Sequence, residues 1–247
     1  MRFIILVGIA FLIGAAVFAT TGFDERRLLR ADPNALPADP ALLHFAASRG
    51  EPLFRAHCAR CHGVSGAGNL AGGVPNLTDN DWLYGTGRIA EIEQVIEYGI
   101  RSRNTKAWNL AIMPAYARPR PNPSDQHIQP LSPNEISDLV EFLLEREGRG
   151  ADAAAASRGA ALFAGDAGCY DCHSTDAKGD SAIGAPDLTD AITLYGDGGR
   201  EALFQSIAYG RQGVCPAWTK RMSAAGIIET AVYVYSLSHP RNTHHAG

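Results

Sequence analysis

The pattern Cys-x-x-Cys-His occurs twice in the sequence, at Cys58, Cys61 and His62 and again at Cys169, Cys172 and His173. Two cysteines at this spacing can form thioether bonds to one haem, and the histidine that follows can ligate its iron. A zinc half-site and a redox dithiol also use Cys-x-x-Cys, but neither requires a histidine directly after the second cysteine, twice in one chain. The pattern therefore predicts two covalently bound c-type haems, with His62 and His173 as proximal ligands.

The sequence around the two motifs repeats, which indicates the elements that must position them. Arg49-Gly50 precedes the first motif as Arg158-Gly159 precedes the second. Pro75-Asn-Leu-Thr-Asp follows the first motif at the distance at which Pro186-Asp-Leu-Thr-Asp follows the second. Each copy ends in an apolar stretch with helical spacing, at residues 135–147 and 225–238. We therefore expect two small all-helical domains in tandem, 42–148 and 149–247, each closed by its own helix.

Length and composition fit this division. A chain of 247 residues accommodates a short targeting segment and two domains of about 100 residues each. The composition is that of an ordinary soluble protein, with 46% hydrophobic and 19% charged residues and a net charge of -4. No basic footprint for nucleic acid is present, so we expect no nucleic-acid partner.

An apolar run from Phe3 to Ala19 indicates export. Seventeen residues are at the short end of what spans a bilayer as a helix, and the run ends in small residues that resemble a cleavage site. We expect residues 1–22 to be a retained membrane anchor, with a cleaved signal as the alternative. The globular part would then lie on the periplasmic side of the inner membrane. Residues 23–41 contain Pro33, Pro37 and Pro40, which predicts an extended tether.

The two domains resemble the class I cytochrome c fold and, more narrowly, the CcoP or FixP family, the membrane-anchored dihaem subunit of cbb3-type cytochrome c oxidases. The similar stretches are residues 75–79, 82–85, 98–102 and 112–116 in the first copy, and 184–190, 209–213, 216–218 and 231–237 in the second. Before about residue 45 the similarity is poor, because many family members carry a longer amino-terminal region. The resemblance implies an all-α chain of two tandem class I cytochrome c domains behind an N-terminal transmembrane or signal helix.

The resemblance also implies the ligands of the first haem. Its iron would be held by His62 and by Met113, which lies in Ile-Met-Pro-Ala-Tyr, where the family places its methionine ligand. The carbonyl groups of Pro75 and Pro186 would orient the two proximal histidines. A purely packing role for Met113 is the alternative.

The second copy has a cysteine, Cys215, at the position equivalent to Met113. Four of the five cysteines are used by the haem motifs, so Cys215 is left over, and a free thiol is a liability in an oxidising compartment. We expect its thiolate to ligate the second haem together with His173, which would lower the reduction potential of that haem. Two alternatives are ligation by Met222 and an open iron site.

Two functional classes follow from these features. The first is an electron-transfer subunit that does no bond chemistry itself. It would pass electrons between donor and acceptor proteins of a respiratory complex, for which the resemblance implies a cbb3-like oxidase. The second is a dihaem oxidoreductase similar to thiosulfate dehydrogenases, in which a cysteine-ligated haem acts on a sulfur compound. A redox or gas sensor with an exchangeable ligand is a third.

Overall fold

The computed structural model describes residues 22–118, 130–150, 152–190 and 192–240. The predicted anchor run Phe3–Ala19 lies outside these residues. Within the described part of the chain, no helix combines the length and apolar character needed to cross a bilayer.

The described residues are helical, with β structure confined to isolated bridges, which confirms the predicted all-helical class. The elements are η1 (Pro33–Ala38), α2 (Pro40–His57), α3 (Ala59–His62), η2 (Leu70–Gly72), α4 (Ile89–Tyr98), α5 (Pro133–Arg146), α6 (Ala153–Ala164), α7 (Tyr170–His173), α8 (Arg200–Tyr209) and α9 (Ala224–Ser238). The two predicted closing helices correspond to α5 and α9. Ser132 caps α5 in a reciprocal capping box with Glu135, and the Ser223 hydroxyl caps α9.

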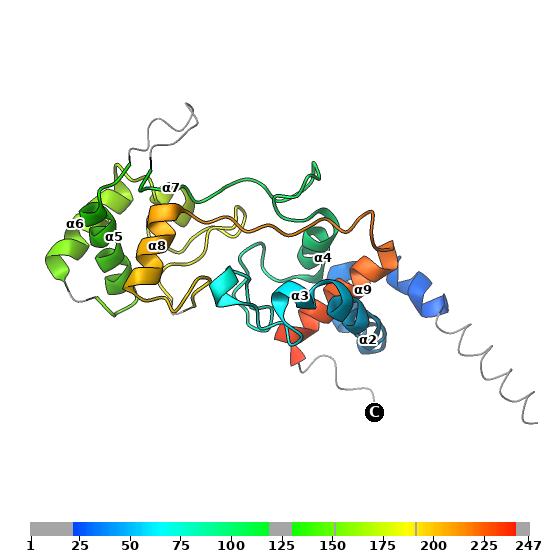
Figure 1. Ribbon diagram of the computed structural model, residues 1–247. Coiled ribbons are helices and arrows are strands. Elements are labelled where there is room, and N and C mark those ends of the chain that lie inside the picture. Colours follow the sequence, from blue (N-terminus) through cyan, green and yellow to red (C-terminus); the bar gives the residue numbers. More distant parts are fainter. Residues whose placement is uncertain (1–21, 119–129, 151, 191, 241–247) are drawn as a thin grey trace, which may run out of the picture.

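The helices form two groups, and each group contains a helix from the other repeat. Helix α9 of the second repeat packs on α2 and α4 of the first, while α5 of the first repeat packs on α6 and α8 of the second. Figure 1 shows α2, α3, α4 and α9 together at one end of the molecule and α5, α6, α7 and α8 at the other. We call the apolar interiors of these groups the first core and the second core. This packing differs from the expectation that each repeat is closed by its own helix.

Two equivalent glycines allow the exchanged helices to approach closely. A Cβ atom on Gly50 of α2 would overlap the backbone carbonyl of Glu229 in α9, and one on Gly159 of α6 would overlap that of Asp138 in α5. Next to these contacts, the rings of Phe54 and Tyr233 lie 5.3 Å apart, and those of Phe142 and Phe163 lie 5.1 Å apart. The same crossing therefore occurs twice, each time between helices of different repeats.

Two segments, residues 100–113 and 211–215, run in opposite directions between the helical groups (Figure 1). We call them the crossing segments. Ile100 and Cys215 exchange both backbone hydrogen bonds at one end, and Met113 and Arg211 exchange both at the other. Residues 101–108 leave the first segment as a loop and return through a bond from Arg101 N to Trp108 O at 2.8 Å. This loop corresponds to a polar insertion that the second repeat lacks.

The segment 23–41 differs from the extended tether that its prolines predicted. Asp32 caps a 3₁₀ helix, η1, and α2 begins at Pro40. Leu28 and Leu36 are 1% and 2% exposed and belong to the first core. The burial of these leucines holds the segment against the first core. The prolines do not prevent this, because proline is well suited to the first turn of a helix and does not force an extended chain there.

Candidate haem sites

Both Cys-x-x-Cys-His motifs lie on short helices that follow a long one. In the first motif, α3 starts directly after α2 and ends at His62, whose Nδ1 lies 3.2 Å from the carbonyl oxygen of Pro75. In the second, α7 ends at His173, whose Nδ1 lies 3.1 Å from the carbonyl oxygen of Pro186. A carbonyl at Nδ1 selects the tautomer that leaves Nε2 free to bind a metal.

Burial tunes these groups for ligation. Desolvation lowers the pKa of His62 and of His173, and the proline carbonyls act in the opposite direction. The neutral imidazole that results is the form that binds iron. None of the five cysteines forms a disulfide. Burial also raises the pKa of Cys58 to about 12 and that of Cys169 to about 11.

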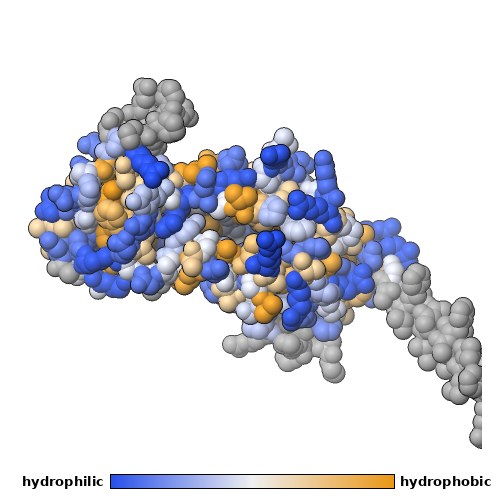
Figure 2. All heavy atoms as spheres, in the orientation of Figure 1, coloured by the Kyte–Doolittle hydropathy of each residue, from blue (hydrophilic) through white to orange (hydrophobic). Residues whose placement is uncertain are grey.

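One cavity of about 940 Å³ reaches both motifs. Its wall includes the four motif cysteines, the two motif histidines, Met113 and Cys215. Most of the other lining residues are apolar, among them Leu77, Trp82, Leu188 and Leu203. Figure 2 shows hydrophobic side chains among hydrophilic ones on the surface between the two helical groups. Paired thiols, an apolar wall and a neutral histidine at each end, half-buried for His62 and buried for His173, fit covalent haem.

Cys215 lies beside the first motif. Its backbone pairs with Ile100, and Trp218, three residues later, donates its N–H to the carbonyl of Ile96 in α4 at 3.0 Å. The ring of Trp218 packs 4.9 Å from that of His57, next to the first haem cysteine. Burial first, and the neighbouring Cys61 second, raise the pKa of the Cys215 thiol to about 11.

Met113 lies in the helical group of the second motif. Besides its pairing with Arg211, its segment continues along α8 through a hydrogen bond from Tyr116 N to Ile207 O at 3.1 Å. The Tyr116 hydroxyl donates to the carbonyl of Ala167 at 2.7 Å, just before the second motif. Met113 packs against the second core.

The resemblance implied that Met113 would join His62, and the repeat register predicted that Cys215 would join His173. The structure places Met113 against the second core and Cys215 near Cys61 of the first motif. The physical reason is the pair of crossing segments, which carry each sulfur residue out of its own repeat. Met222, the alternative ligand for the second haem, packs against the first core instead, and its sulfur accepts a hydrogen bond from the Thr230 hydroxyl at 3.5 Å.

Arg101 is a residue to which the sequence assigned no role. Its guanidinium donates to the carbonyl groups of Ala111 and Gly213, one on each crossing segment, and to the Tyr84 hydroxyl at 2.8 Å. The Arg101 backbone has a positive φ of 46°, unusual for a residue other than glycine. Arg101 therefore ties the two segments together at the wall of the cavity. In the sequence, only the place of Arg101 directly after Tyr-Gly-Ile could have drawn attention to it. Its role could not be predicted, because the groups that it bonds to are distant in sequence.

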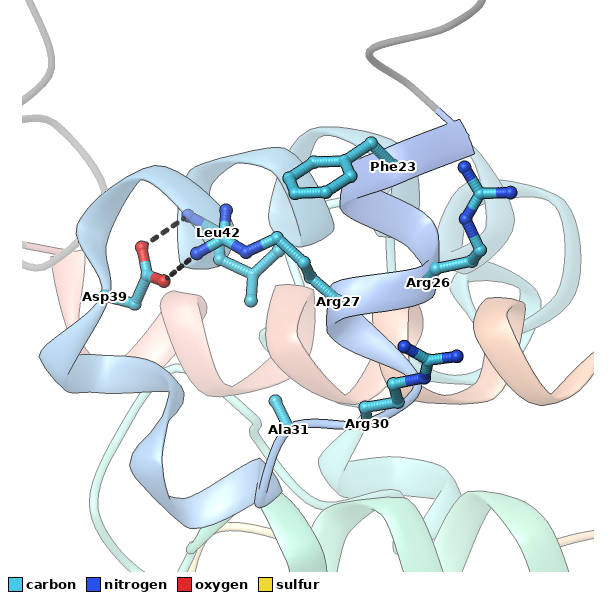
Figure 3. Close-up of a pocket in the computed structure, with 7 residues that line it drawn as sticks. All are labelled: Phe23, Arg26, Arg27, Arg30, Ala31, Asp39 and Leu42. Atoms are coloured by element: carbon cyan, nitrogen blue, oxygen red, sulfur yellow. Dashed lines mark hydrogen bonds and ion pairs between the residues drawn. The ribbon is translucent and has the colours of Figure 1, made fainter.

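A second, smaller hollow of about 340 Å³ lies near the start of the described chain. Its lining residues, drawn in Figure 3, are Phe23, Arg26, Arg27, Arg30, Ala31, Asp39 and Leu42. Arg27 reaches Asp39 at 2.7 Å, while Arg26 and Arg30 extend on the side away from that carboxylate (Figure 3). This hollow contains none of the haem-site residues.

Comparisons with known proteins agree with the site. The family model of cytochrome c matches residues 47–147, and that of cytochrome c oxidase, cbb3-type, subunit III matches residues 154–234. Domains of this kind carry covalently bound haem c.

Relatives match over most of the chain. The cbb3-type cytochrome c oxidase subunit CcoP of Cereibacter sphaeroides is 39% identical over 86% of this chain and 68% of its own length. The CcoP subunit of Rhodobacter capsulatus is 38% identical over 86% of this chain and 69% of its own, and the FixP subunit of a Bradyrhizobium species is 39% identical over 81% and 63%. The chain thus belongs to the CcoP/FixP family, subunit III of the cbb3-type cytochrome c oxidases.

Proposed function

We propose that this chain binds two haems, one at each Cys-x-x-Cys-His motif, and transfers electrons as a subunit of a cbb3-type oxidase. The relatives described above are all named as subunits of such an oxidase, which favours electron transfer over the sulfur chemistry that Cys215 suggested. Bound haem would supply a one-electron Fe(III)/Fe(II) couple at each site.

The residues of each site have separate tasks. Cys58 and Cys61 would attach the first haem, and His62 would ligate its iron while Pro75 orients the imidazole. Cys169, Cys172, His173 and Pro186 would do the same at the second site. The apolar cavity wall would exclude water, which limits the reorganisation that accompanies a change in charge.

The observation that carries the proposal is the cavity shared by both motifs. The crossing segment 211–215 links the two ends of this cavity, and its four residue steps can span at most about 14 Å. Two redox centres that lie at opposite ends of one cavity within one protein can exchange electrons without diffusion of a carrier. A pair of haems held in this way suits a subunit that accepts electrons at one site and passes them on from the other.

Location follows from the apolar run Phe3–Ala19. We infer that this run anchors the chain in the inner membrane and that the haem sites lie on its periplasmic side. Phe23 follows the run and is 57% exposed, and an aromatic side chain at the end of an apolar run is typical of the membrane interface.

Purification and respiration test this function together. From detergent-solubilised membranes, an affinity-tagged chain should carry with it the haem-copper core subunit. In a strain without other terminal oxidases, deletion of the gene should abolish oxygen consumption, and a wild-type copy should restore it. A copy with His62→Ala and His173→Ala should not restore it. A chain that purifies without a haem-copper subunit, and whose deletion leaves respiration unchanged, would contradict the proposal.

A further inference from the structure

We propose that the two repeats exchange the distal ligands of their haems. Cys215 of the second repeat completes the coordination of the first haem, opposite His62, and Met113 of the first repeat completes that of the second, opposite His173. This inference rests on the proposed function to the extent that both motifs carry haem.

The position of Cys215 is fixed by hydrogen bonds to Ile100, which follows α4 in the first repeat, and the next residues bond to α4 itself. Ile100 N donates to Cys215 O at 2.9 Å, and Cys215 N donates to Ile100 O at 3.0 Å. Further along, Thr219 N donates to the carbonyl of Glu97 at 3.3 Å. Gly99 has a φ of +79°, and a Cβ atom there would overlap the carbonyl oxygen of Cys215. This stretch of the second repeat therefore lies in contact with the end of α4.

The position of Met113 is fixed by the equivalent contacts at the end of α8. Met113 N donates to Arg211 O at 3.1 Å, and Arg211 N donates to Met113 O at 3.2 Å. Gly210 has a φ of +71°, and a Cβ atom there would overlap the carbonyl oxygen of Met113. Gly99 and Gly210 occupy the same place in the two repeats, so the exchange is symmetrical.

If each repeat supplied the distal ligand of its own haem, these contacts would have to break. Met113 is paired with Arg211 and Cys215 with Ile100, and the four residue steps from 211 to 215 separate the two pairs by up to about 14 Å. For Met113 to bind the first haem or Cys215 the second, each residue would have to leave the backbone partner that now holds it in the other helical group. Tyr116 also holds the Met113 segment to the loop before the second motif, through its bond to Ala167.

Single-haem variants of the full-length chain test the exchange. Cys58→Ala/Cys61→Ala removes attachment of the first haem, and Cys169→Ala/Cys172→Ala removes that of the second. Low-temperature electron paramagnetic resonance of the oxidised proteins reports thiolate ligation, and the long-wavelength absorption band of ferric haem reports methionine ligation.

We expect the thiolate signal to disappear in the variant that lacks the first haem and to persist in the variant that lacks the second. The methionine band should behave in the opposite way. A thiolate signal that persists without the first haem would overturn the inference, as would its absence from the wild type. The haem content of the wild type, obtained from the intact mass, separately tests whether two haems are bound.

A second measurement avoids removing a haem. In the reduced dihaem protein, the methyl group of an iron-bound methionine is strongly shifted in the proton NMR spectrum. We expect nuclear Overhauser contacts from the Met113 methyl to Leu188, which packs against the second core, and none to Leu77, which packs against the first. Contacts to Leu77 in place of Leu188 would overturn the exchange even if the single-haem variants did not fold.

Discussion

Ile100 and Cys215 exchange both backbone hydrogen bonds, at 2.9 and 3.0 Å, although they belong to different repeats. This pairing holds the end of the second repeat against the first haem motif. Together with the equivalent pair of Met113 and Arg211, it makes each haem site a product of both repeats. The two sites should therefore respond to substitutions in the opposite repeat.

The first prediction concerns the exchanged aromatic pairs. Tyr233→Ala removes a ring that packs on Phe54 of α2, and Phe142→Ala removes one that packs on Phe163 of α6. Because these rings are half-buried, we expect each variant to lose about 2 kcal/mol of stability. Hydrogen exchange should show lost amide protection in α2 for Tyr233→Ala and in α6 for Phe142→Ala. Protection lost in the helices of the same repeat instead would contradict the exchanged packing.

The second prediction compares two ion pairs at equivalent places. Arg49 of α2 pairs with Glu229 of α9, whose side chain is 4% exposed, and Arg158 of α6 pairs with Asp138 of α5, whose side chain is 14% exposed. Arg49→Ala leaves the more deeply buried carboxylate without its ion-pair partner, so we expect it to lower the free energy of unfolding by about 2–3 kcal/mol. Arg158→Ala should cost clearly less, since water reaches Asp138 more easily. Urea unfolding would measure both, and equal losses would show that burial of the carboxylate does not set the cost.

The third prediction concerns Arg101, whose guanidinium joins the two crossing segments at the cavity wall. Arg101→Gln removes a positive charge from the wall of the cavity that both motifs share, and a positive charge favours the reduced state of a haem. We expect the reduction potentials to fall by on the order of tens of millivolts in a potentiometric titration. Arg103→Gln, on the exposed part of the same loop, is the matched control and should leave them unchanged. An equal fall in both variants would point to overall charge as the cause.

The fourth prediction concerns the asymmetry of the two ligands. A thiolate stabilises ferric iron and a thioether favours ferrous iron, so Cys215→Met should raise one of the two reduction potentials by on the order of 0.1 V. The reduction step whose potential rises should be the step that is missing from the titration of Cys58→Ala/Cys61→Ala. A control with Cys215→Ser removes the thiolate without supplying a thioether and should weaken the distal bond. If the potential that changes is instead that of the step missing from Cys169→Ala/Cys172→Ala, Cys215 belongs to the second haem.

Local features of the fold could be predicted from the sequence. The haem motifs, the apolar spacing of α5 and α9 and the serine caps all act within a few residues, so the pattern of one segment is enough to identify them. The prolines at 75 and 186 were likewise found at a fixed distance after each motif, and their carbonyls lie beside the histidine rings.

The exchange between repeats could not be predicted in this way. Gly50 of α2 and Gly159 of α6 allow the same close approach of a neighbouring helix, and α5 and α9 have the same kind of apolar face. Either of these two helices is therefore compatible with α2 or with α6. The choice depends on pairings such as Ile100 with Cys215, which are distant in sequence and carry no pattern of their own. The burial of Leu36 escaped prediction for a related reason, because its partners lie in the first core and the surrounding prolines indicated an exposed tether.

An experimental structure of the dihaem protein, with the irons located by anomalous scattering, would test the exchanged ligation most directly. We expect the iron bound by His62 to have the Cys215 sulfur as its distal ligand, and the iron bound by His173 to have that of Met113. Met113 sulfur bound to the iron of His62 would contradict the exchange.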